Sequence, residues 1–403
     1  MKKSVCIILS VLMLLSVIAV APISVNAYTS GDYGYTLSSS GNATIYDYYG
    51  SKSNITIPAK LDGHKVTAIA ARAFTEHYLN KVVISKGIKK IGNSAFEACH
   101  MSSITLPSTI TTIEFDAFNE NDLETVTLPE KALNLGEGIF DYNLKLKSVT
   151  LPSKLTKIPA RCFAGCWKLK TIKFPKALKS IGKTAFANCR KLETVKFPSK
   201  LTKIGENAFD RCEILKTIKF NEGLKTIGKE AFEDCYALEK VTLPYSLTEL
   251  GEDAFCNCTA MKSVTMRDKV KKIGSHALGY YNEVMGDDEL MYFELDNFTV
   301  KAYKGSEGAK YASDNGFTLK TMKKPTKVKL NKKTKSLAKG KTFKLKATLT
   351  PKTAVTLLTW KSSNKKVATV TQKGKVKAKK KGTAVITVKT HNGKKAKCKI
   401  KVK

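Results

Sequence analysis

Cysteine is the residue whose spacing first suggests chemistry in this chain of 403 residues. Six of the ten cysteines share one position of a repeated segment, which asparagine holds in two further copies: Cys99, Cys166, Cys189, Cys212, Cys235 and Cys258, with Asn121 and Asn143. A zinc site is disfavoured, because Cys256 and Cys258 are too close together and no histidine cluster accompanies them. Disulfides between adjacent copies remain open, although a ladder of like positions does not divide naturally into pairs. We favour buried side chains whose polar atoms bond to turn backbone.

Catalytic patterns are absent from the sequence. The five histidines are scattered among predicted caps and turns: His64, His77, His100, His276 and His391. The sequence contains no glycine-rich phosphate loop, nucleophile elbow or zinc-protease motif. Asp287 and Asp288 form an acidic pair with no partner at a repeated position. The sequence therefore predicts no catalytic, metal-binding or cofactor-binding residue and favours a protein that is not an enzyme, with an exported enzyme as the weaker alternative.

A repeat of 22 to 23 residues organises the middle of the chain. An isoleucine or leucine, usually followed by glycine, recurs at Ile69, Ile91, Ile113, Leu135, Ile158, Ile181, Ile204, Ile227, Leu250 and Ile273. A phenylalanine follows five positions later in every copy except the last, which has Leu278. A fixed period of this length indicates a solenoid. A unit this small can bury its apolar face only against its neighbours.

One strand is predicted in each repeat. Leu169 to Phe174 alternates apolar and polar residues, and Pro175 ends the run. Copies of this strand should pair in parallel about 4.8 Å apart. The Ala-Phe-x-x-Cys segment should then form a short turn or helix on the opposite side. The predicted fold class is a solenoid with a parallel β-sheet on one face and short turns or helices on the other.

The string Leu-x-x-Val-x-Leu-Pro-x-x-Leu-x-x-Ile-Gly-x-x-Ala-Phe-x-x-Cys resembles the repeat of BspA-like leucine-rich-repeat surface proteins. The resemblance implies a leucine-rich-repeat solenoid in a bacterial surface or secreted protein, with adhesion or host-protein binding in some members. Residues 28–68 resemble the N-terminal cap of that family, and residues 69–324 the solenoid with its C-terminal closing unit. The last repeat carries an insertion around residues 280–295, either a decorated capping loop, which we favour, or a functional loop.

The N-terminus resembles a targeting segment. Lys2 and Lys3 precede an apolar run from Val5 to Val20, and a small-residue cleavage site ends at Ala27. This pattern predicts a signal peptide over residues 1–27. No second apolar span follows it. We therefore expect a secreted protein that is associated with the cell surface and has no integral membrane segment after cleavage.

The C-terminal segment has a composition of its own. Residues 325–403 carry 26 lysines and no arginine, aspartate or glutamate, so they hold +26 of the formal net charge of +36. Short alternating runs between glycine turns predict an all-β sandwich. The stretches from Trp360 to Asn364 and from Lys381 to Ala384 resemble the bacterial immunoglobulin-like group 2 domain, which implies a surface module.

The charge of this segment predicts its partner. A strongly positive module next to the cell envelope should associate with anionic cell-wall polymers. Nucleic acid is the competing partner for the same charge. We predict no nucleic-acid binding, because the segment lacks arginine, and its aromatic residues Phe343 and Trp360 are expected in the core rather than as stacking platforms.

The outward positions of the predicted strands are the candidate ligand-binding residues. They are rich in hydroxyl groups and carry lysine in three successive repeats. The candidates are Thr171, Thr194, Thr217, Lys173, Lys196 and Lys219, together with Trp167, a large aromatic residue at a variable position. Threonine also suits β-structure and lysine keeps a surface soluble. The expected partners are host or neighbouring-cell proteins or glycans, and the alternative is a purely structural surface or spacer protein.

Overall fold

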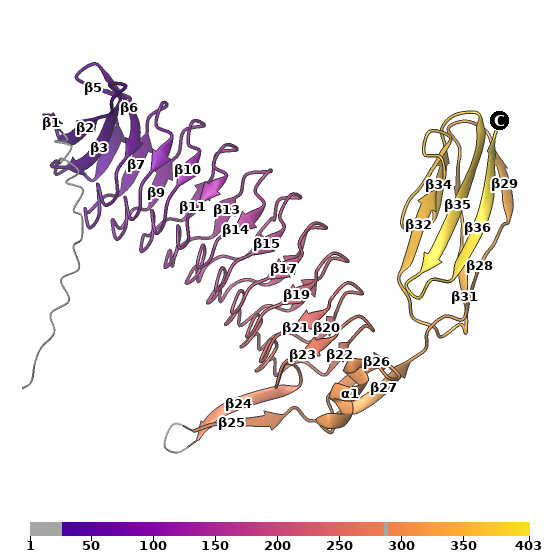
Figure 1. Ribbon diagram of the computed structural model, residues 1–403. Helices are drawn as coiled ribbons and strands as arrows, with labels where there is room; N and C mark the ends of the chain where they lie inside the picture. The colour runs from indigo at the N-terminus through magenta and orange to yellow at the C-terminus, as the bar shows by residue number, and fades with distance from the viewer. Residues whose placement is uncertain (1–25, 286–288) are drawn as a thin grey trace, which may run out of the picture.

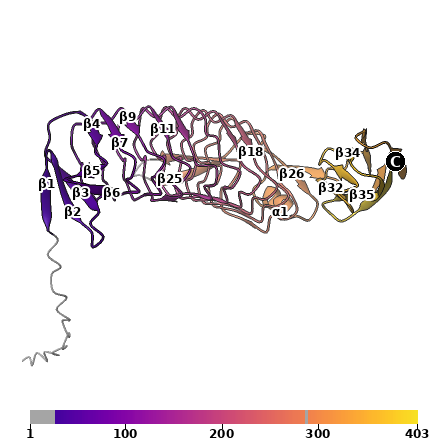
Figure 2. The same ribbon diagram turned by 90° about the horizontal axis from the view of Figure 1, so that it is seen from above.

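The computed structural model describes residues 26–285 and 289–403 (Figure 1). The signal-peptide prediction falls almost wholly outside these residues. Stacked coils form an elongated solenoid, and a β-domain follows the last coil (Figures 1 and 2). Within the described residues, no helix is long and apolar enough to cross a membrane. The predicted fold class, a parallel β-solenoid followed by an all-β module, is confirmed.

The N-terminal end of the solenoid is closed by an antiparallel meander. It consists of β1 (Ala27–Ser30), β2 (Tyr33–Leu37) and β3 (Ala43–Tyr48). β3 pairs in parallel with β6 (His64–Ile69), which forms a hairpin with β5 (Lys60–Leu61). The ring of Tyr48 stacks on Phe74 with the centroids 5.5 Å apart. The meander therefore covers an apolar end that an uncapped solenoid would expose to water.

Each coil contributes a strand to what we call the first sheet. Its strands are β4 (Asn54–Ile57), β7 (Lys81–Ile84), β9 (Ser103–Thr105), β11 (Thr125–Thr127), β13 (Ser148–Thr150), β16 (Thr194–Lys196), β18 (Thr217–Lys219), β20 (Lys240–Thr242), β22 (Ser263–Thr265), β26 (Thr299–Tyr303) and β27 (Thr318–Met322). The strands are parallel, and equivalent residues lie side by side, as Lys196 does with Lys219. At the coil without a full strand, Thr171 still forms a bridge to Thr194. The repeat is therefore kept in register along the sheet.

A second row of shorter strands, which the sequence analysis did not predict, contains the isoleucines that define the repeat. These strands are β8 (Lys90–Ile91), β10 (Thr112–Ile113), β12 (Asn134–Leu135), β14 (Lys157–Ile158), β15 (Ser180–Ile181), β17 (Lys203–Ile204), β19 (Thr226–Ile227), β21 (Glu249–Leu250) and β23 (Lys272–Ile273). Glycine follows most of them because the coils approach closely there. A Cβ on Gly205 would lie 2.6 Å from the backbone of Gly182. A larger residue at that position would force the two coils apart.

The Ala-Phe-x-x-Cys segments are turns. Each reverses direction through residues in the left-handed region, such as Thr184 with φ of 51° and Asn188 with φ of 58°. Left-handed residues interrupt a right-handed helix. Adjacent turns are joined by hydrogen bonds, and the amide of Phe186 donates to the carbonyl of Ala208 at 2.8 Å. Of the two alternatives that the sequence left open, turn or helix, the structure has the turn.

A column of phenylalanines fills the core between the sheets and the turns. The nine rings from Phe74 to Phe255 are fully buried. Successive rings stack with their centroids 4.8 to 5.7 Å apart. Each ring contacts the ring before it and the ring after it, so the core is continuous although no single coil could form one.

The repeated cysteines are buried beside this column. The thiol of Cys212 donates to the carbonyl of Phe186 in the preceding coil at 3.4 Å, and the amide of Asn143 donates to that of Phe118 at 2.8 Å. Burial raises the pKa of the Cys212 thiol well above its ordinary value, so the thiol keeps the proton that it donates. All nine cysteines in the described residues are free. The interpretation as buried turn donors is confirmed, and no disulfide joins adjacent coils there.

The predicted insertion is an antiparallel hairpin of β24 (Tyr280–Met285) and β25 (Glu289–Glu294), which projects from the last repeat (Figure 1). The acidic pair of Asp287 and Asp288 lies outside the described residues. β26, helix α1 (Glu307–Asp314) and β27 then close the solenoid. The hydroxyl of Tyr311 on α1 donates to the carbonyl of Leu278 at 2.8 Å, so the helix is fixed against the last repeat.

The C-terminal domain is all-β. Its strands are β28 (Lys327–Leu330), β29 (Thr334–Leu337), β30 (Thr342–Lys344), β31 (Ala347–Thr350), β32 (Leu358–Ser362), β33 (Ala368–Val370), β34 (Lys375–Ala378), β35 (Gly382–Thr390) and β36 (Lys395–Val402). A sheet in the order β29-β36-β35-β32 and one in the order β30-β34-β33 enclose an apolar core that contains Trp360. The lysines alternate with this core, and all 26 are exposed except Lys335, which is half-buried. The positive charge therefore lies outside the core.

Candidate interaction surface

The first sheet brings six of the seven predicted binding residues onto one face. Thr171, Thr194 and Thr217 form one row, and Lys173, Lys196 and Lys219 occupy the position two residues further along each strand. All six side chains are exposed, whereas Val195 between Thr194 and Lys196 is buried. Strand alternation explains this placement, because neighbouring residues of a strand point to opposite sides of the sheet. We call Lys173, Lys196 and Lys219 the lysine column.

The lysine column is electrostatically unpaired. Within the part of the chain that the structure describes, none of its three lysines forms an ion pair with a carboxylate. By contrast, Glu124 and Lys147, which each precede a strand of the first sheet, form an ion pair, with Oε2 of Glu124 2.9 Å from Nζ of Lys147. Like charges directly opposite one another on a sheet are destabilising. The lysine column therefore contributes no ion-pair stabilisation to the sheet and leaves three unpaired positive charges on its face.

A shallow depression of about 390 Å³ adjoins the lysine column. Its lining residues come from two neighbouring coils: Val149, Thr150, Leu151, Ser153, Lys173, Phe174, Pro175 and Lys176. The lining therefore combines two lysines, Lys173 and Lys176, with apolar side chains such as Phe174. The depression could hold an apolar part of a ligand whose negative group contacts Lys173.

Trp167 is exposed as predicted but lies in a turn rather than on a strand of the first sheet. It is 39% exposed and sits in the turn before the strand position of Thr171. The guanidinium of Arg190 lies 4.6 Å from the centroid of its ring, and Nε of Arg190 is 3.4 Å from Oε1 of Glu213. A neighbouring coil therefore covers part of the indole, and the structure separates Trp167 from the lysine column.

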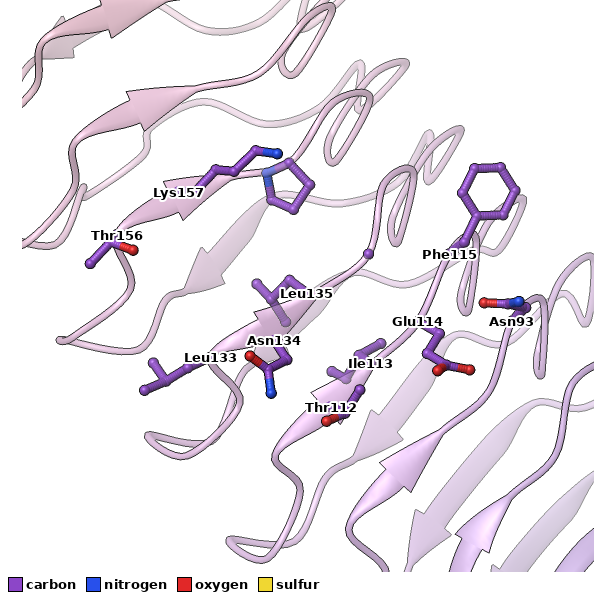
Figure 3. A pocket seen from close by; sticks show the side chains of 12 residues that line it. Asn93, Thr112, Ile113, Glu114, Phe115, Leu133, Asn134, Leu135, Thr156 and Lys157 are labelled. Atoms are coloured by element: carbon purple, nitrogen blue, oxygen red, sulfur yellow. The ribbon is translucent and has the colours of Figure 1, made fainter.

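Sequence reasoning missed a depression of about 470 Å³ over the second row of strands (Figure 3). It opens where that row breaks, since β12 pairs with β10 but not with β14. The repeat changes length at the same place: Leu135 is 22 residues after Ile113 and 23 before Ile158. Phe115 and Leu133 at this site are 44% and 41% exposed. The change of period was the available sequence signal.

Sequence reasoning also missed buried carboxyl groups along the turns. The guanidinium of Arg161 bridges two coils, with its nitrogens 3.2 Å from Asp116 and 3.1 Å from Asp141. Burial raises the pKa of Asp141 to about 6. In the described residues, no three histidine, cysteine or acidic side chains converge as metal ligands would. Asp116 and Asp141 are therefore linked through Arg161 into an ion-pair network across neighbouring coils.

The comparisons with known proteins agree with this architecture. A model of the BspA type leucine rich repeat region matches residues 67–193 and 179–284, more than half of the chain. The chain belongs to the BspA-type leucine-rich-repeat family. A model of the bacterial Ig-like domain (group 2) matches residues 325–400. Both resemblances noted in the sequence are confirmed, and the matched families are those of surface modules rather than enzymes.

Several solved structures are similar to this BspA-type chain. A leucine rich cell surface protein from Faecalibacterium prausnitzii is 24% identical over 61% of this chain and 89% of its own, with a TM-score of 0.32. The pneumococcal vaccine antigen PcpA is 18% identical over 74% of this chain and 99% of its own, with a TM-score of 0.40. A leucine rich repeat protein from T. pallidum is 23% identical over 59% and 91%, with a TM-score of 0.31.

One curated protein shares a short segment with the chain. A kappa-carrageenase from Pseudoalteromonas carrageenovora is 48% identical over 66 residues, which are 16% of this chain. The matched segment spans 17% of the carrageenase. The similarity therefore concerns one small part of each protein.

Proposed function

We propose that this protein is a bacterial surface interaction protein that binds an anionic protein or glycan on the outward face of its first sheet. The observation that carries the proposal is the lysine column, with exposed threonine hydroxyls beside it. Lys196 and Lys219 are register partners on adjacent strands, and such strands lie about 4.8 Å apart. A negative ligand would relieve the repulsion between these charges, whereas a purely structural surface would gain nothing from it.

The family and the domain arrangement support this proposal. Repeat solenoids present extended surfaces that bind partners across several units. The signal-like residues 1–27 support export, and the group 2 immunoglobulin-like domain supports placement at the cell surface. A purely structural spacer is the alternative, and it predicts that the sheet face binds nothing specifically.

A charge-reversal experiment separates these two functions. The full chain lacking residues 1–27 is screened against host matrix proteins and an array of glycans, beside the variant K173E/K196E/K219E. The matched control is K157E/K179E/K203E, which changes three exposed lysines that also lack ion pairs in the described structure but lie on or next to the second row of strands. We expect the column variant to lose its hits and the control to keep them. Equal loss in both variants, or no hits at all, would favour the spacer.

The exposed lysines of the C-terminal domain support a second binding role, association with anionic polymers of the cell envelope. The domain carries no acidic residue to offset its 26 lysines. Charge attraction of this kind is screened at high salt, since the Debye length falls to roughly 3 Å at 1 M. Retention of the full chain on purified cell walls should therefore fall steeply between 0.05 M and 1 M salt. Retention that does not depend on salt would rule out this role.

A further inference from the structure

A groove lies where the end of the first sheet meets the immunoglobulin-like domain. It has a volume of about 470 Å³. One side is formed by Thr265, Arg267, Lys301, Lys320, Thr321, Met322 and Lys323 of the solenoid, and the other by Thr353 and Val355 of the immunoglobulin-like domain. We call it the junction groove. It contains four cationic side chains and no acidic one.

The junction groove continues the row of positions that holds the lysine column. Thr265 is the register partner of Lys301, and Lys301 is the register partner of Lys320. Lys219 is the third residue of β18, and Thr265 is the third residue of β22, so the two residues hold the same strand position in their repeats. An elongated ligand lying across the strands would therefore pass from the lysine column to the junction groove.

The cations of the groove are not neutralised by the protein. Among the described residues, Arg267, Lys301, Lys320 and Lys323 form no ion pair. Nε of Arg267 is buried and has no hydrogen-bond partner. The nearby carboxylate of Asp268 is engaged through Oδ2, which lies 2.9 Å from Nζ of Lys324, while its Oδ1 is buried without a hydrogen-bond partner. A buried donor without a partner is rare, and here it belongs to a residue that lines the groove.

Contacts between the two domains hold the groove in shape. The hydroxyl of Tyr303 donates to the carbonyl of Val355 at 2.7 Å, and the amide of Val355 donates to the carbonyl of Lys323 at 3.0 Å. The guanidinium of Arg267 lies 4.5 Å from the ring centroid of Tyr245. Both walls are therefore positioned before a ligand arrives, which lowers the entropic cost of binding.

We propose that the junction groove binds a carboxylate or sulfate group of an acidic polysaccharide. Lysine and arginine supply only donors, so the ligand must be rich in acceptors. The hydroxyls of Thr265, Thr321 and Thr353 add donors that can also accept from sugar hydroxyls. Met322 and Val355 also line the groove, and their apolar atoms can contact a sugar ring.

Two other polyanions fit the groove less well. An extended acidic peptide gains most of its affinity by pairing with a free strand edge, but the edge of β27 beside the groove is already paired, because Lys323 forms a parallel bridge to Ala354. Single-stranded nucleic acid gains affinity by stacking bases on aromatic side chains, but no aromatic residue lines the groove. An acidic polysaccharide needs neither feature.

This inference deepens the proposed function, because it names the ligand class for one end of the same face, but its test uses different residues. The full chain without residues 1–27 is titrated by calorimetry with a heparin-type sulfated octasaccharide, a carboxylated galacturonate octamer, a neutral maltooctaose and an oligodeoxyadenylate of equal charge. The test variant is K320E/K323E. The matched control is K304E/K310E, which reverses two exposed lysines of the closing unit outside the groove.

We expect the test variant to weaken binding of at least one acidic octasaccharide by about tenfold or more, the effect of losing charge-assisted hydrogen bonds. The control should change binding by less than about threefold, as expected for removal of a distant charge. The two acidic sugars distinguish a sulfate site from a carboxylate site. Equal losses in test and control variants, binding of maltooctaose, or tighter binding of the oligodeoxyadenylate would overturn the inference.

The column variant K173E/K196E/K219E separates the two claims. If it binds the octasaccharide normally while K320E/K323E does not, the groove inference stands and the lysine column fails. If the column variant loses binding while K320E/K323E retains it, the proposed function stands and the groove inference fails.

Discussion

The thiol of Cys212 and the amides of Asn121 and Asn143 make equivalent hydrogen bonds in different coils. Each donates a hydrogen bond to the carbonyl oxygen of a phenylalanine in the preceding coil, at 3.4, 2.7 and 2.8 Å. The carbonyl is buried, and a buried acceptor without a donor is destabilising. The position therefore selects for a donor of suitable size, which explains why cysteine and asparagine alternate there.

Replacing Cys212 by valine should destabilise the solenoid. Valine fills a similar volume but cannot donate to the carbonyl of Phe186, so we expect a loss of about 1 to 3 kcal/mol in the free energy of unfolding. Urea denaturation of the full chain measures this loss in the free energy of unfolding. Cys212→Asn retains a donor of the kind that the chain uses elsewhere, and it should lose less. If the Cys212→Val variant is as stable as the wild type, the hydrogen bond has no structural role.

At the scale of single residues, the sequence allowed the buried donors to be recognised, because asparagine and cysteine occupy the same position of the repeat. It did not reveal the contacts between charged side chains. Arg161 reaches Asp116, which lies 45 residues earlier in the chain. Such a pairing depends on how far a flexible side chain extends across two coils, and repeat spacing alone carries no information about that.

The turns form an element with its own titration behaviour. Burial, together with the charges of the neighbouring acids Asp234 and Glu230, raises the pKa of Asp210 to about 7, although Arg211 opposes the shift. Burial, followed by the charges of nearby acids, raises the pKa of Glu233 to about 8. Oδ1 of Asp210 is also buried without a hydrogen-bond partner. The folded turns therefore bind protons more tightly than the unfolded chain does.

The solenoid should consequently be more stable at mildly acidic than at alkaline pH. When the folded pKa exceeds the unfolded value, stability is fully present below the unfolded pKa and is lost as the pH rises through the folded pKa. For Asp210 and Glu233 this loss falls between about pH 4 and pH 8. The melting temperature of the solenoid should thus be higher at pH 5.5 than at pH 8.5.

The variant D210N/E233Q should flatten this pH dependence, because both titrating groups are removed. Differential scanning calorimetry across the pH range gives the comparison, with the exposed Glu137→Gln as control. A variant whose melting temperature varies with pH as strongly as that of the wild type would show that other groups are responsible.

The second row of strands shows why elements were harder to predict than the repeat. A strand of two residues, such as Ser180–Ile181, is too short to show alternation. The turns were ambiguous for a different reason. Alanine and phenylalanine are compatible with a helix, and only the left-handed conformations of residues such as Thr184 and Asn188 exclude one. The first sheet was predictable because its alternation and its proline recur in register.

At the scale of the whole molecule, His391 of the immunoglobulin-like domain packs into the end of the solenoid. Its ring centroid lies 4.7 Å from that of Tyr245 and 5.4 Å from that of Tyr303. Nδ1 is 2.7 Å from the hydroxyl of Thr356, and Nε2 is 3.4 Å from Asp268. The two domains therefore meet around a buried imidazole, whose side chain is 5% exposed, and no local pattern in the sequence could reveal this contact.

Acidification should loosen this junction. Burial lowers the pKa of His391 below its usual 6.5, and the charges of Lys324 and Arg267 reinforce this, although Asp268 opposes it. Tyr245 and Tyr303 face the same ring. A group with a depressed folded pKa contributes stability above its unfolded pKa, and that stability is lost as the pH falls through the folded pKa. Docking should therefore weaken below about pH 6.5.

Small-angle X-ray scattering at pH 7.5 and pH 5 checks this expectation. The maximum dimension and flexibility of the wild type should increase at the lower pH. His391→Phe keeps an aromatic ring between the two tyrosines without a titrating group, so its scattering should change much less. A wild-type profile that is identical at the two pH values would contradict the role assigned to His391.

The central claim is that the first sheet binds a ligand itself, in addition to the salt-dependent attraction of anionic polymers to the more highly charged C-terminal domain. Lysine acetylation footprinting of the full chain, with and without a heparin-type sulfated polysaccharide, tests this directly. We predict protection of Lys173, Lys196 and Lys219, while Lys157, Lys179 and Lys203 react as before. Protection confined to lysines of residues 325–403 would show that the sheet is a scaffold and would contradict the central claim.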